Sequence, residues 1–374
     1  MVQTQAENAG AQEISRLVGA RLAARGFDVH NLFFFLRSSS FDAPPNTTYC
    51  ATSRPGTPLA FLRFLWALAR SIRQTRPDAV LTFQHYGNTI GGAVARLVSA
   101  APVIANQVSA RLTTNRLVRA VDWAMGSLGV FKCITVNSLE MYRDYSHYPG
   151  GYRRRLAHVA HGFDQKSTEI TKGAARQRFG LPRDGIVLGS VARLHPLKQL
   201  DAAIRILANR PGWNLALAGQ GADETRLRKL AAELGVSNRV YFVGEISPAN
   251  VGTFLACLDV FVFPSLAETF GLAAVEAANA GVPVVANDLP VLREVLSCQG
   301  EPAAVFVNAS DTAMLAAAVS KVLEDGALSE TLRRNAKGLR LRYSVDSMVD
   351  DYVRILQDVC GRSLSEPLAA CHDG

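Results

Sequence analysis

The sequence lacks the features that define several classes of small or membrane-spanning proteins. Its six cysteines, spread over 374 residues, include no Cys-x-x-Cys pair, which argues against a disulfide scaffold and a zinc framework. No window of about 18 residues is free of charge, because Arg63, Arg70 and Arg96 interrupt the most apolar stretches, so we expect no transmembrane helix. We also find no secretory signal, repeat or low-complexity tract. We therefore expect a cytoplasmic protein.

The composition is that of a globular protein with a sizeable core. Hydrophobic residues make up 48% of the chain and charged residues 19%, a balance that argues against intrinsic disorder and against a fibrous protein. At about 100 to 200 residues per domain, the length predicts two domains.

The net charge of +8 is unevenly distributed. Residues 1–166 contain 19 Lys and Arg against 9 Asp and Glu, a balance of +10, whereas residues 167–374 contain 21 against 23, a balance of −2. Such polarity favours an anionic partner for the first half, either a phospholipid surface or a phosphate-bearing substrate. A solvated, arginine-rich surface explains the charge equally well, and both interpretations stay open.

Short apolar runs alternate with longer helical patterns along most of the chain, as in parallel α/β units. In the first half we expect strands at 28–35, 78–83, 102–106 and 132–136, with helices near 11–25, 59–75, 89–99 and 115–129. In the second half we expect strands at 186–192, 213–218, 239–243, 259–263, 282–286 and 303–307. Near-continuous apolar strands suit a sheet covered on both faces. The sequence therefore predicts an α/β fold of two doubly wound, Rossmann-like domains that face a central cleft.

Two segments of the first half do not fit this alternation. Residues 42–58 are rich in Pro and Thr, so we predict a loop there. Only residues 1–5 precede a polar loop at 7–12, where a doubly wound domain usually opens with an apolar strand. Either this first strand is truncated, with the native chain starting upstream of Met1, or it is very short.

Two glutamates, Glu268 and Glu276, flank the expected start of a helix after the strand at 259–263. The amino terminus of a helix attracts a phosphate through its N–H groups and its dipole. Carboxylates repel phosphate and bind hydroxyl groups instead. The arrangement suits a nucleotide sugar, which carries a diphosphate between two polyols. Alternatively, Glu268 pairs with the helix dipole and Glu276 is a solvated helix residue.

Two cations, Arg193 and Lys198, are expected beyond the strand at 186–192. A leaving diphosphate gains negative charge as its bond to the sugar breaks, and cations and N–H groups can stabilise that charge. The sequence contains no Asp-x-Asp metal signature, which favours stabilisation without a metal ion. Taken alone, both residues are more typical of ordinary surface charges.

Several motifs together resemble the family 4 retaining glycosyltransferases, which have the GT-B fold. They are the glutamate pair, VARLHPLK (191–198), LAGQGAD (217–223) and RVYFVGEIS (239–247). The resemblance covers most of residues 180–345. In the first half it is weaker and is carried by residues 9–12, PDAVLTFQH, TVNS (135–138) and AHGFD (160–164).

The resemblance implies a role for each matching residue. Arg193 and Lys198 would hold the donor diphosphate, Glu268 a sugar hydroxyl and Glu276 the ribose. Phe270, Gly271 and Leu272 would cradle sugar and phosphate through their backbone amides, Gly10 would let the backbone approach the phosphates, and Phe242 to Gly244 would line the base pocket.

The resemblance also divides the chain. Residues 1–165 would form an acceptor-binding domain and residues 166–345 a nucleotide-sugar-binding domain. Residues 346–360 would form a helix that packs back on the first domain, and residues 361–374 a flexible tail.

The chain departs from the family pattern at one position. Many members carry a histidine after the strand corresponding to 102–106, where this sequence has Gln107. His85 and Arg111 lie in nearby expected loops, and the sequence assigns no role to any of the three. His161 is expected to be a hinge or core residue rather than a catalyst.

We therefore expect a retaining glycosyltransferase that moves a hexose-type sugar from a UDP- or GDP-linked donor, without a metal ion. The acceptor would be a carbohydrate or a polyprenyl-diphosphate-linked saccharide, in the synthesis of cell-surface polysaccharide. The apolar, arginine-bearing segment 59–73 and the arginines at 153–155 suit an enzyme resting on anionic lipid at the cytoplasmic face of the membrane; alternatively, 59–73 is a buried helix. Nucleic acid is not an expected partner. A non-catalytic nucleotide-sugar-binding scaffold and a sugar-nucleotide epimerase or hydrolase remain alternatives.

Overall fold

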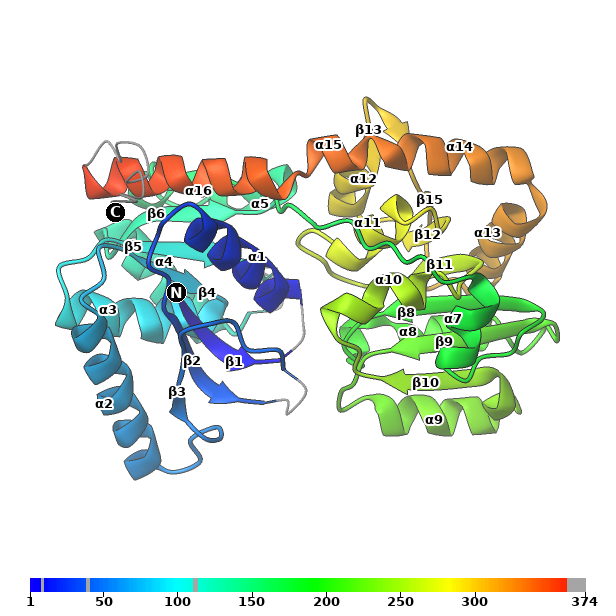
Figure 1. The fold of residues 1–374 in the computed structure, drawn as a ribbon, viewed down its shortest axis with the longest axis horizontal. Coiled ribbons are helices and arrows are strands. Elements are labelled where there is room, and N and C mark those ends of the chain that lie inside the picture. Colours follow the sequence, from blue (N-terminus) through cyan, green and yellow to red (C-terminus); the bar gives the residue numbers. More distant parts are fainter. Residues whose placement is uncertain (8–9, 38–40, 110–113, 362–374) are drawn as a thin grey trace, which may run out of the picture. The chain divides into compact units, whose positions relative to one another are not determined.

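The computed structural model describes residues 1–7, 10–37, 41–109 and 114–361. These residues form two compact units, each built on its own parallel sheet (Figure 1). Of the described residues, the first unit holds 1–7, 11–162 and 345–361, and the second holds 10 and 163–344. The expected tail at 361–374 lies outside the described residues, apart from Gly361.

The first unit has a seven-stranded sheet with the order β3-β2-β1-β4-β5-β6-β7, in which all neighbouring strands are parallel. Its strands are β1 (Val2–Ala6), β2 (Asn31–Leu36), β3 (Thr47–Ala51), β4 (Val80–Phe83), β5 (Val103–Gln107), β6 (Phe131–Val136) and β7 (Leu156–His158). Its helices are α1 (Gly10–Ala24), α2 (Pro58–Thr75), α3 (Gly92–Val98), α4 (Arg116–Leu128), α5 (Leu139–Ser146), α6 (Gly150–Arg153) and α16 (Val345–Cys360). A short π-helix, η1 (Gly87–Gly91), directly precedes α3.

Local sequence signals explain where these helices begin. The Thr57 hydroxyl accepts a hydrogen bond from the Ala60 amide and Pro58 occupies the first turn of α2, which is the usual chemistry of a helix start. In α2, Phe64, Leu68 and Ile72 are buried, so one face of this helix packs on the sheet. At the other end of the chain, α16 belongs to the first unit, where the Tyr352 hydroxyl donates to Asn106 Oδ1 over 2.7 Å.

The prediction of a loop over residues 42–58 was wrong. Residues 47–51 form the strand β3, which pairs in parallel with β2 at the edge of the sheet. The β-forming side chains of this segment, Thr47, Thr48 and Tyr49 among them, outweigh the prolines that precede it. The first strand is present as the five-residue β1 between β2 and β4.

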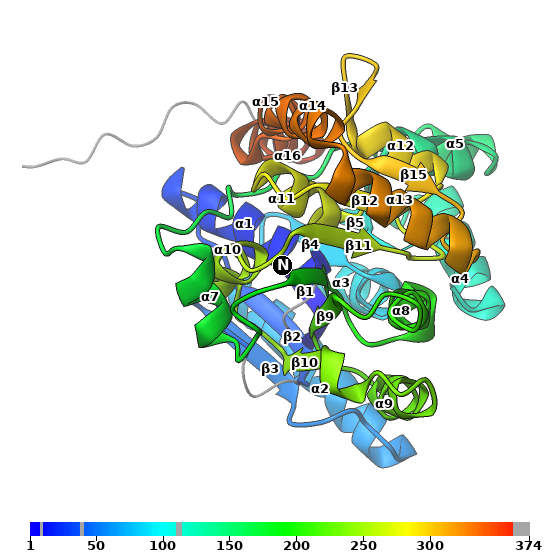
Figure 2. The same ribbon diagram turned by 90° about the vertical axis from the view of Figure 1, so that its right-hand side faces the viewer.

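The second unit has a six-stranded parallel sheet with the order β10-β9-β8-β11-β12-β15. Its strands are β8 (Ile186–Val191), β9 (Trp213–Ala218), β10 (Val240–Gly244), β11 (Val260–Phe263), β12 (Val284–Asn287) and β15 (Val305–Val307). Helix α7 (Lys172–Arg178) precedes these strands. The helices α8 (Leu200–Arg205), α9 (Glu224–Glu233), α10 (Val251–Leu255), α11 (Leu272–Asn279), α12 (Pro290–Val295) and α13 (Thr312–Glu324) lie between and after them (Figure 2). Two further helices, α14 (Gly326–Lys337) and α15 (Leu339–Arg342), and a small hairpin of β13 (Ser297–Cys298) and β14 (Glu301–Pro302) complete the unit.

The predicted fold class, two doubly wound parallel α/β domains, is confirmed. In each unit the chain reverses its direction of winding at one pair of strands, β1 and β4 in the first and β8 and β11 in the second. Such a reversal opens a crevice at the carboxyl ends of the two strands, where ligands bind in folds of this kind. Among the described residues, no helix combines the length and the apolar character needed to cross a membrane.

Candidate functional site

The motif residues of the second unit lie where its sheet reverses direction. β8 and β11 are neighbouring parallel strands, so their carboxyl ends meet at one edge of the sheet. Arg193 and Lys198 follow β8, and Glu268 follows β11. We call these three residues, together with Glu276 on α11, the edge cluster.

The loop that carries Arg193 is fixed by backbone hydrogen bonds to the loop after β9. The Leu194 amide donates to Gln220 O over 3.0 Å, and the Asp223 amide donates to Leu194 O over 3.1 Å. Gly219 permits this close approach, because a Cβ there would lie 1.9 Å from Ala192 O and its φ is +139°. The LAGQGAD segment therefore supports the backbone at Arg193, whose side chain is exposed.

Lys198 and Glu268 form an ion pair at the edge cluster, with Nζ and Oε1 2.5 Å apart. Both side chains are largely buried, with exposures of 20% and 11%. A backbone hydrogen bond of 2.8 Å from the Leu266 amide to Leu197 O holds the two loops together. The structure thus brings a candidate phosphate-binding cation and a candidate hydroxyl-binding carboxylate into direct contact.

His195 lies between the two cations of the edge cluster. Burial, together with the positive charges of Arg193 and Lys198, lowers the pKa of its imidazole, and the charge of Asp223 opposes this shift. Its Nδ1 accepts a hydrogen bond from the Leu197 amide over 3.2 Å. This hydrogen bond shapes the loop that carries Lys198.

Helix α11 begins beside Glu268 and carries Glu276. Gly271 stands at its N-cap with φ +84°, a left-handed conformation that favours glycine. Phe270 and Gly271 are buried, and Leu272 is the first residue of the helix. Glu276 is only 6% exposed, so it is not the solvated helix residue considered as an alternative.

Lys166 is a site residue that the sequence did not indicate. Its Nζ lies 3.7 Å from Glu276 Oε1, and the two side chains are 9% and 8% exposed. Lys166 belongs to the segment that follows AHGFD and matches none of the motifs. Only the folded chain shows that a cation stands beside the second glutamate.

The remaining predicted residues occupy separate places. The Phe242 ring packs against the core, and the Arg228 guanidinium of α9 covers it at 4.1 Å from the ring centroid. Gly244 ends β10 with φ +80°, and its carbonyl accepts a 2.7 Å hydrogen bond from the Gly219 amide. Gly10 is the first residue of α1, and a Cβ there would meet no atom within 4 Å. Their roles as base-pocket and phosphate-loop residues stay predictions.

In the first unit, Gln107 is a buried structural residue. It is 2% exposed, and its Nε2 donates to Asp122 Oδ1 over 2.7 Å and to the Tyr152 hydroxyl over 3.1 Å.

Burial lowers the pKa of His85 to about 4, and its Nε2 lies 2.6 Å from the Thr114 hydroxyl. Arg111 lies outside the described residues.

His161 is also buried, with 6% of its surface exposed. Burial, with a smaller contribution from the charge of His158, lowers its pKa to about 3. An imidazole so far from solvent and held neutral fits the hinge or core role expected for it.

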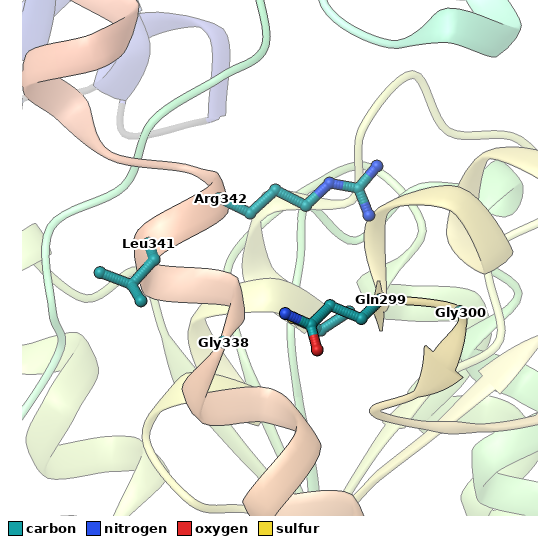
Figure 3. Close-up of a pocket in the computed structure, with 6 residues that line it drawn as sticks. Gln299, Gly300, Gly338, Leu341 and Arg342 are labelled. Carbon is teal, nitrogen blue, oxygen red and sulfur yellow. The ribbon is translucent and has the colours of Figure 1, made fainter.

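A recess elsewhere in the second unit does not involve the edge cluster (Figure 3). It lies between the turn of the β13–β14 hairpin and helices α14 and α15, and Arg342 Nη1 donates to Glu294 O and Ser297 O beside it. The recess is lined by Cys298, Gln299, Gly300, Gly338, Leu341 and Arg342.

Comparison with known proteins agrees with this architecture. HepE of Anabaena, solved in complex with UDP and glucose, superposes with a TM-score of 0.79 at 19% identity, covering 96% of this chain and 99% of HepE. The fold of two Rossmann-like domains shared with such structures is the GT-B fold of glycosyltransferases.

Sequence comparison gives the family. Residues 171–339 match the family Glycosyl transferases group 1. The D-inositol 3-phosphate glycosyltransferase of Acidothermus cellulolyticus is 34% identical over 197 residues, which are 49% of this chain and 43% of that protein. The lipopolysaccharide core biosynthesis mannosyltransferase LpsB of Rhizobium meliloti is 27% identical over 53% of this chain and 61% of its own length. The match to the group 1 glycosyltransferases covers the second unit, and the resemblance to family 4-type glycosyltransferases inferred from the motifs is confirmed. The chain spans about half the length of the curated relatives it matches.

Proposed function

We propose that the protein is a retaining glycosyltransferase that moves a hexose from a nucleotide sugar to a carbohydrate or lipid-linked saccharide in the synthesis of cell-surface glycan. The observation that carries this proposal is the Lys198–Glu268 pair at the carboxyl ends of β8 and β11, directly before α11. One partner suits a phosphate and the other suits a sugar hydroxyl. Relatives that include glycosyltransferases of inositol phosphate and of lipopolysaccharide core support the same class of reaction.

In this proposal each member of the edge cluster contacts one part of the donor. Arg193 and Lys198 bind the diphosphate and stabilise the charge that it gains as the bond to the sugar breaks, without a metal ion. Glu268 accepts a hydrogen bond from a sugar hydroxyl, and Glu276 accepts hydrogen bonds from the ribose. When the donor binds, the diphosphate and the sugar therefore take over the interactions that Lys198 and Glu268 make with each other.

Retention follows if the acceptor hydroxyl attacks from the face that the diphosphate leaves. The departing phosphate oxygen then accepts the acceptor proton, so the reaction needs no strong protein base. The Nδ1 of His195 accepts a hydrogen bond from the Leu197 amide, which is compatible with a structural role. The main contribution of the protein is then orientation of the two substrates and exclusion of water.

Calorimetric titration with UDP, GDP and ADP tests the donor site. We expect one nucleotide to bind selectively, with UDP favoured because HepE binds it, and Glu276→Ala to weaken that binding. Glu233→Ala, an exposed glutamate on α9, is the matched control and should change nothing. Binding of none of the three nucleotides would contradict the proposal.

A transfer assay then separates the alternative functions. Glu268→Ala should abolish sugar transfer while nucleoside diphosphate binding remains, because Glu268 is assigned to the sugar. Donor binding without any turnover would favour a non-catalytic scaffold. Donor turnover that needs no acceptor would favour an epimerase or a hydrolase.

We further propose that the acceptor lies at an anionic membrane surface of the cytoplasmic face, and that helices α2, α3 and α4 contact it. α2 packs against α3, and α4 packs against η1, which continues directly into α3, so the three helices are neighbours in the first unit. These helices contain one acidic residue, Asp122, and it is buried. Their exposed arginines are Arg63, Arg70, Arg73, Arg96 and Arg116, and their exposed apolar residues are Leu59, Phe61, Leu62, Trp66, Leu97, Leu117, Val121, Trp123 and Leu128.

This surface, the α2–α4 face, combines the two properties that bind a protein to anionic lipid. Exposed Leu and Trp side chains insert at the headgroup boundary and arginines attract the lipid charge. Leu62 and Trp66, one turn apart on α2, are 62% and 63% exposed, so this part of α2 is not the buried helix considered as an alternative.

Co-sedimentation with vesicles tests the membrane contact. We expect binding to phosphatidylglycerol-containing vesicles, weaker binding to pure phosphatidylcholine, and a decrease with salt. The double change Leu62→Ser with Trp66→Ser should weaken binding about tenfold or more, since each side chain loses its apolar burial. Leu341→Ser, which alters an 86% exposed leucine of the second unit, is the control. Equal binding of the wild-type protein, the double variant and the control would refute the proposal that the α2–α4 face contacts the membrane.

A further inference from the structure

Lys166, which is buried beside Glu276, has no place in the donor chemistry described so far. Lys166 Nζ lies 3.7 Å from Glu276 Oε1, and each side chain is at least nine-tenths buried. Burying two charges is costly, and a close opposite charge repays that cost only in part. A buried lysine beside a proposed ligand-binding carboxylate therefore calls for an explanation beyond stability.

The position of Lys166 is imposed by α10. A Cβ on Gly252 would lie 2.7 Å from Ser167 O and 3.0 Å from the carbonyl carbon of Lys166, so the helix and this segment are in close backbone contact. The Thr253 hydroxyl donates to the Thr168 hydroxyl over 3.3 Å just beyond it. Lys166 is thus held by the backbone on one side and faces Glu276 with its charged end.

We propose that Lys166 is a positioning residue for Glu276: it compensates and orients the Glu276 carboxylate so that this group accepts hydrogen bonds from the ribose of the donor nucleotide. This inference rests on the proposed donor site. The ribose is linked directly to a diphosphate of like charge to the carboxylate. An uncompensated Glu276 would therefore repel the ligand whose hydroxyls it binds.

The edge cluster shows the same arrangement twice. Glu268 is paired with Lys198 and Glu276 with Lys166, and in both pairs the lysine comes from a segment far from α11 in the sequence. The two lysines differ in accessibility, because Lys198 is 20% exposed and Lys166 is 9% exposed. Lys198 can therefore exchange its partner for a phosphate, whereas Lys166 stays with its glutamate.

The test measures how strongly the protein depends on the ribose hydroxyls. The dissociation constants of UDP and 2′,3′-dideoxy-UDP are compared, with GDP and its dideoxy form in parallel, and the ratio within a pair reports the hydroxyl contacts alone. In the wild-type protein we expect a ratio of about 10 or more, as for hydrogen bonds to a charged group. Glu276→Gln should lower this ratio to about 3 or less.

Lys166→Met should lower the ratio in the same way, and Lys166→Arg should restore most of it. The double variant that combines Lys166→Met with Glu276→Gln should have the same ratio as Glu276→Gln alone, because the two residues act as a unit. Lys172→Met is the matched control. Lys172 pairs with Asp259, which directly precedes β11 and so lies at the end of that strand opposite to the edge cluster. Loss of Lys172 should therefore lower the melting temperature and leave the ratio unchanged.

The outcomes separate this inference from the donor site itself. A ratio that falls in Glu276→Gln but not in folded Lys166→Met would overturn the inference and leave the donor site standing. A ratio that falls in neither variant would show that Glu276 does not contact the ribose, and would therefore also refute the role of Lys166. Failure of the wild-type protein to bind any of these nucleotides would refute both.

Discussion

Asp122 on α4 offers a quantitative test of the buried polar network in the first unit. Its carboxylate is 8% exposed, accepts a 2.9 Å hydrogen bond from the Tyr152 hydroxyl and accepts one from Gln107. Burial raises the pKa of Asp122 from 3.8 to about 6, although both hydrogen bonds favour the ionised form and oppose the shift. Ionised Asp122 is therefore disfavoured in the folded protein relative to the unfolded chain.

The sign of the pH dependence follows from the direction of this shift. A carboxyl group whose pKa is higher in the folded state binds its proton more tightly there, so it stabilises the fold most at low pH. This contribution is complete below about pH 3.8, is lost between pH 3.8 and about 6, and is absent above that range. At 1.36 kcal/mol for each pH unit, the loss amounts to about 3 kcal/mol.

Replacement by a neutral amide isolates this effect from the other titrating groups. The free energy of unfolding of Asp122→Asn relative to the parent should improve by about 2 to 3 kcal/mol from pH 4 to pH 7. Urea unfolding followed by fluorescence measures it in a Trp213→Phe background, where the remaining tryptophans, Trp66 and Trp123, report on the first unit. Asp42→Asn, an exposed control, should show no such trend. A difference between Asp122→Asn and its parent that stays constant across this range would refute the reasoning.

Three further changes test packing in the second unit by urea unfolding, with nucleotide titration alongside. Arg176→Met should lower the free energy of unfolding by about 3 to 5 kcal/mol, since it removes a buried guanidinium that bonds Asp259 and three backbone carbonyl oxygens. Nucleotide affinity should persist, and a loss below 1 kcal/mol would contradict this. Gly271→Ala should lower the free energy of unfolding by about 2 kcal/mol or more, because φ is +84° and the new Cβ would lie 2.6 Å from Leu292 Cδ2. It should also weaken nucleotide binding. An unchanged urea midpoint together with unchanged nucleotide affinity would contradict this. Tyr343→Phe should be neutral or stabilising by about 1 kcal/mol, because its buried hydroxyl has no partner among the described residues; a marked loss would indicate an unseen partner.

Most of the fold was predictable because its inner strands are largely apolar. β11 is a buried run of Val and Phe, and β8 opens with Ile, Val and Leu; such runs indicate the inner strands of a covered parallel sheet. β3 was missed because it stands at the edge, where a strand needs no apolar run, and its five residues follow a proline-rich stretch.

The candidate site was predictable as separate residues but not as contacts. The motifs indicated Glu268 and Lys198 independently, each with its own partner in a ligand. Their ion pair follows from the adjacency of β8 and β11 and from the bond between Leu266 and Leu197. Both depend on the tertiary fold, so no local pattern contains them.

Charge balance explains why Lys166 escaped notice and why it belongs to the site. A motif of two glutamates specifies two negative charges beside a ligand that is itself negative, and a fold that buries these carboxylates must supply cations from elsewhere in the chain. Any segment that reaches the right place can supply them, so the cation carries no motif of its own. In this protein a loop after β8 provides Lys198, and the segment held against α10 provides Lys166. Together, the edge cluster and Lys166 carry three positive and two negative charges, and the excess positive charge suits the diphosphate that we propose this site binds.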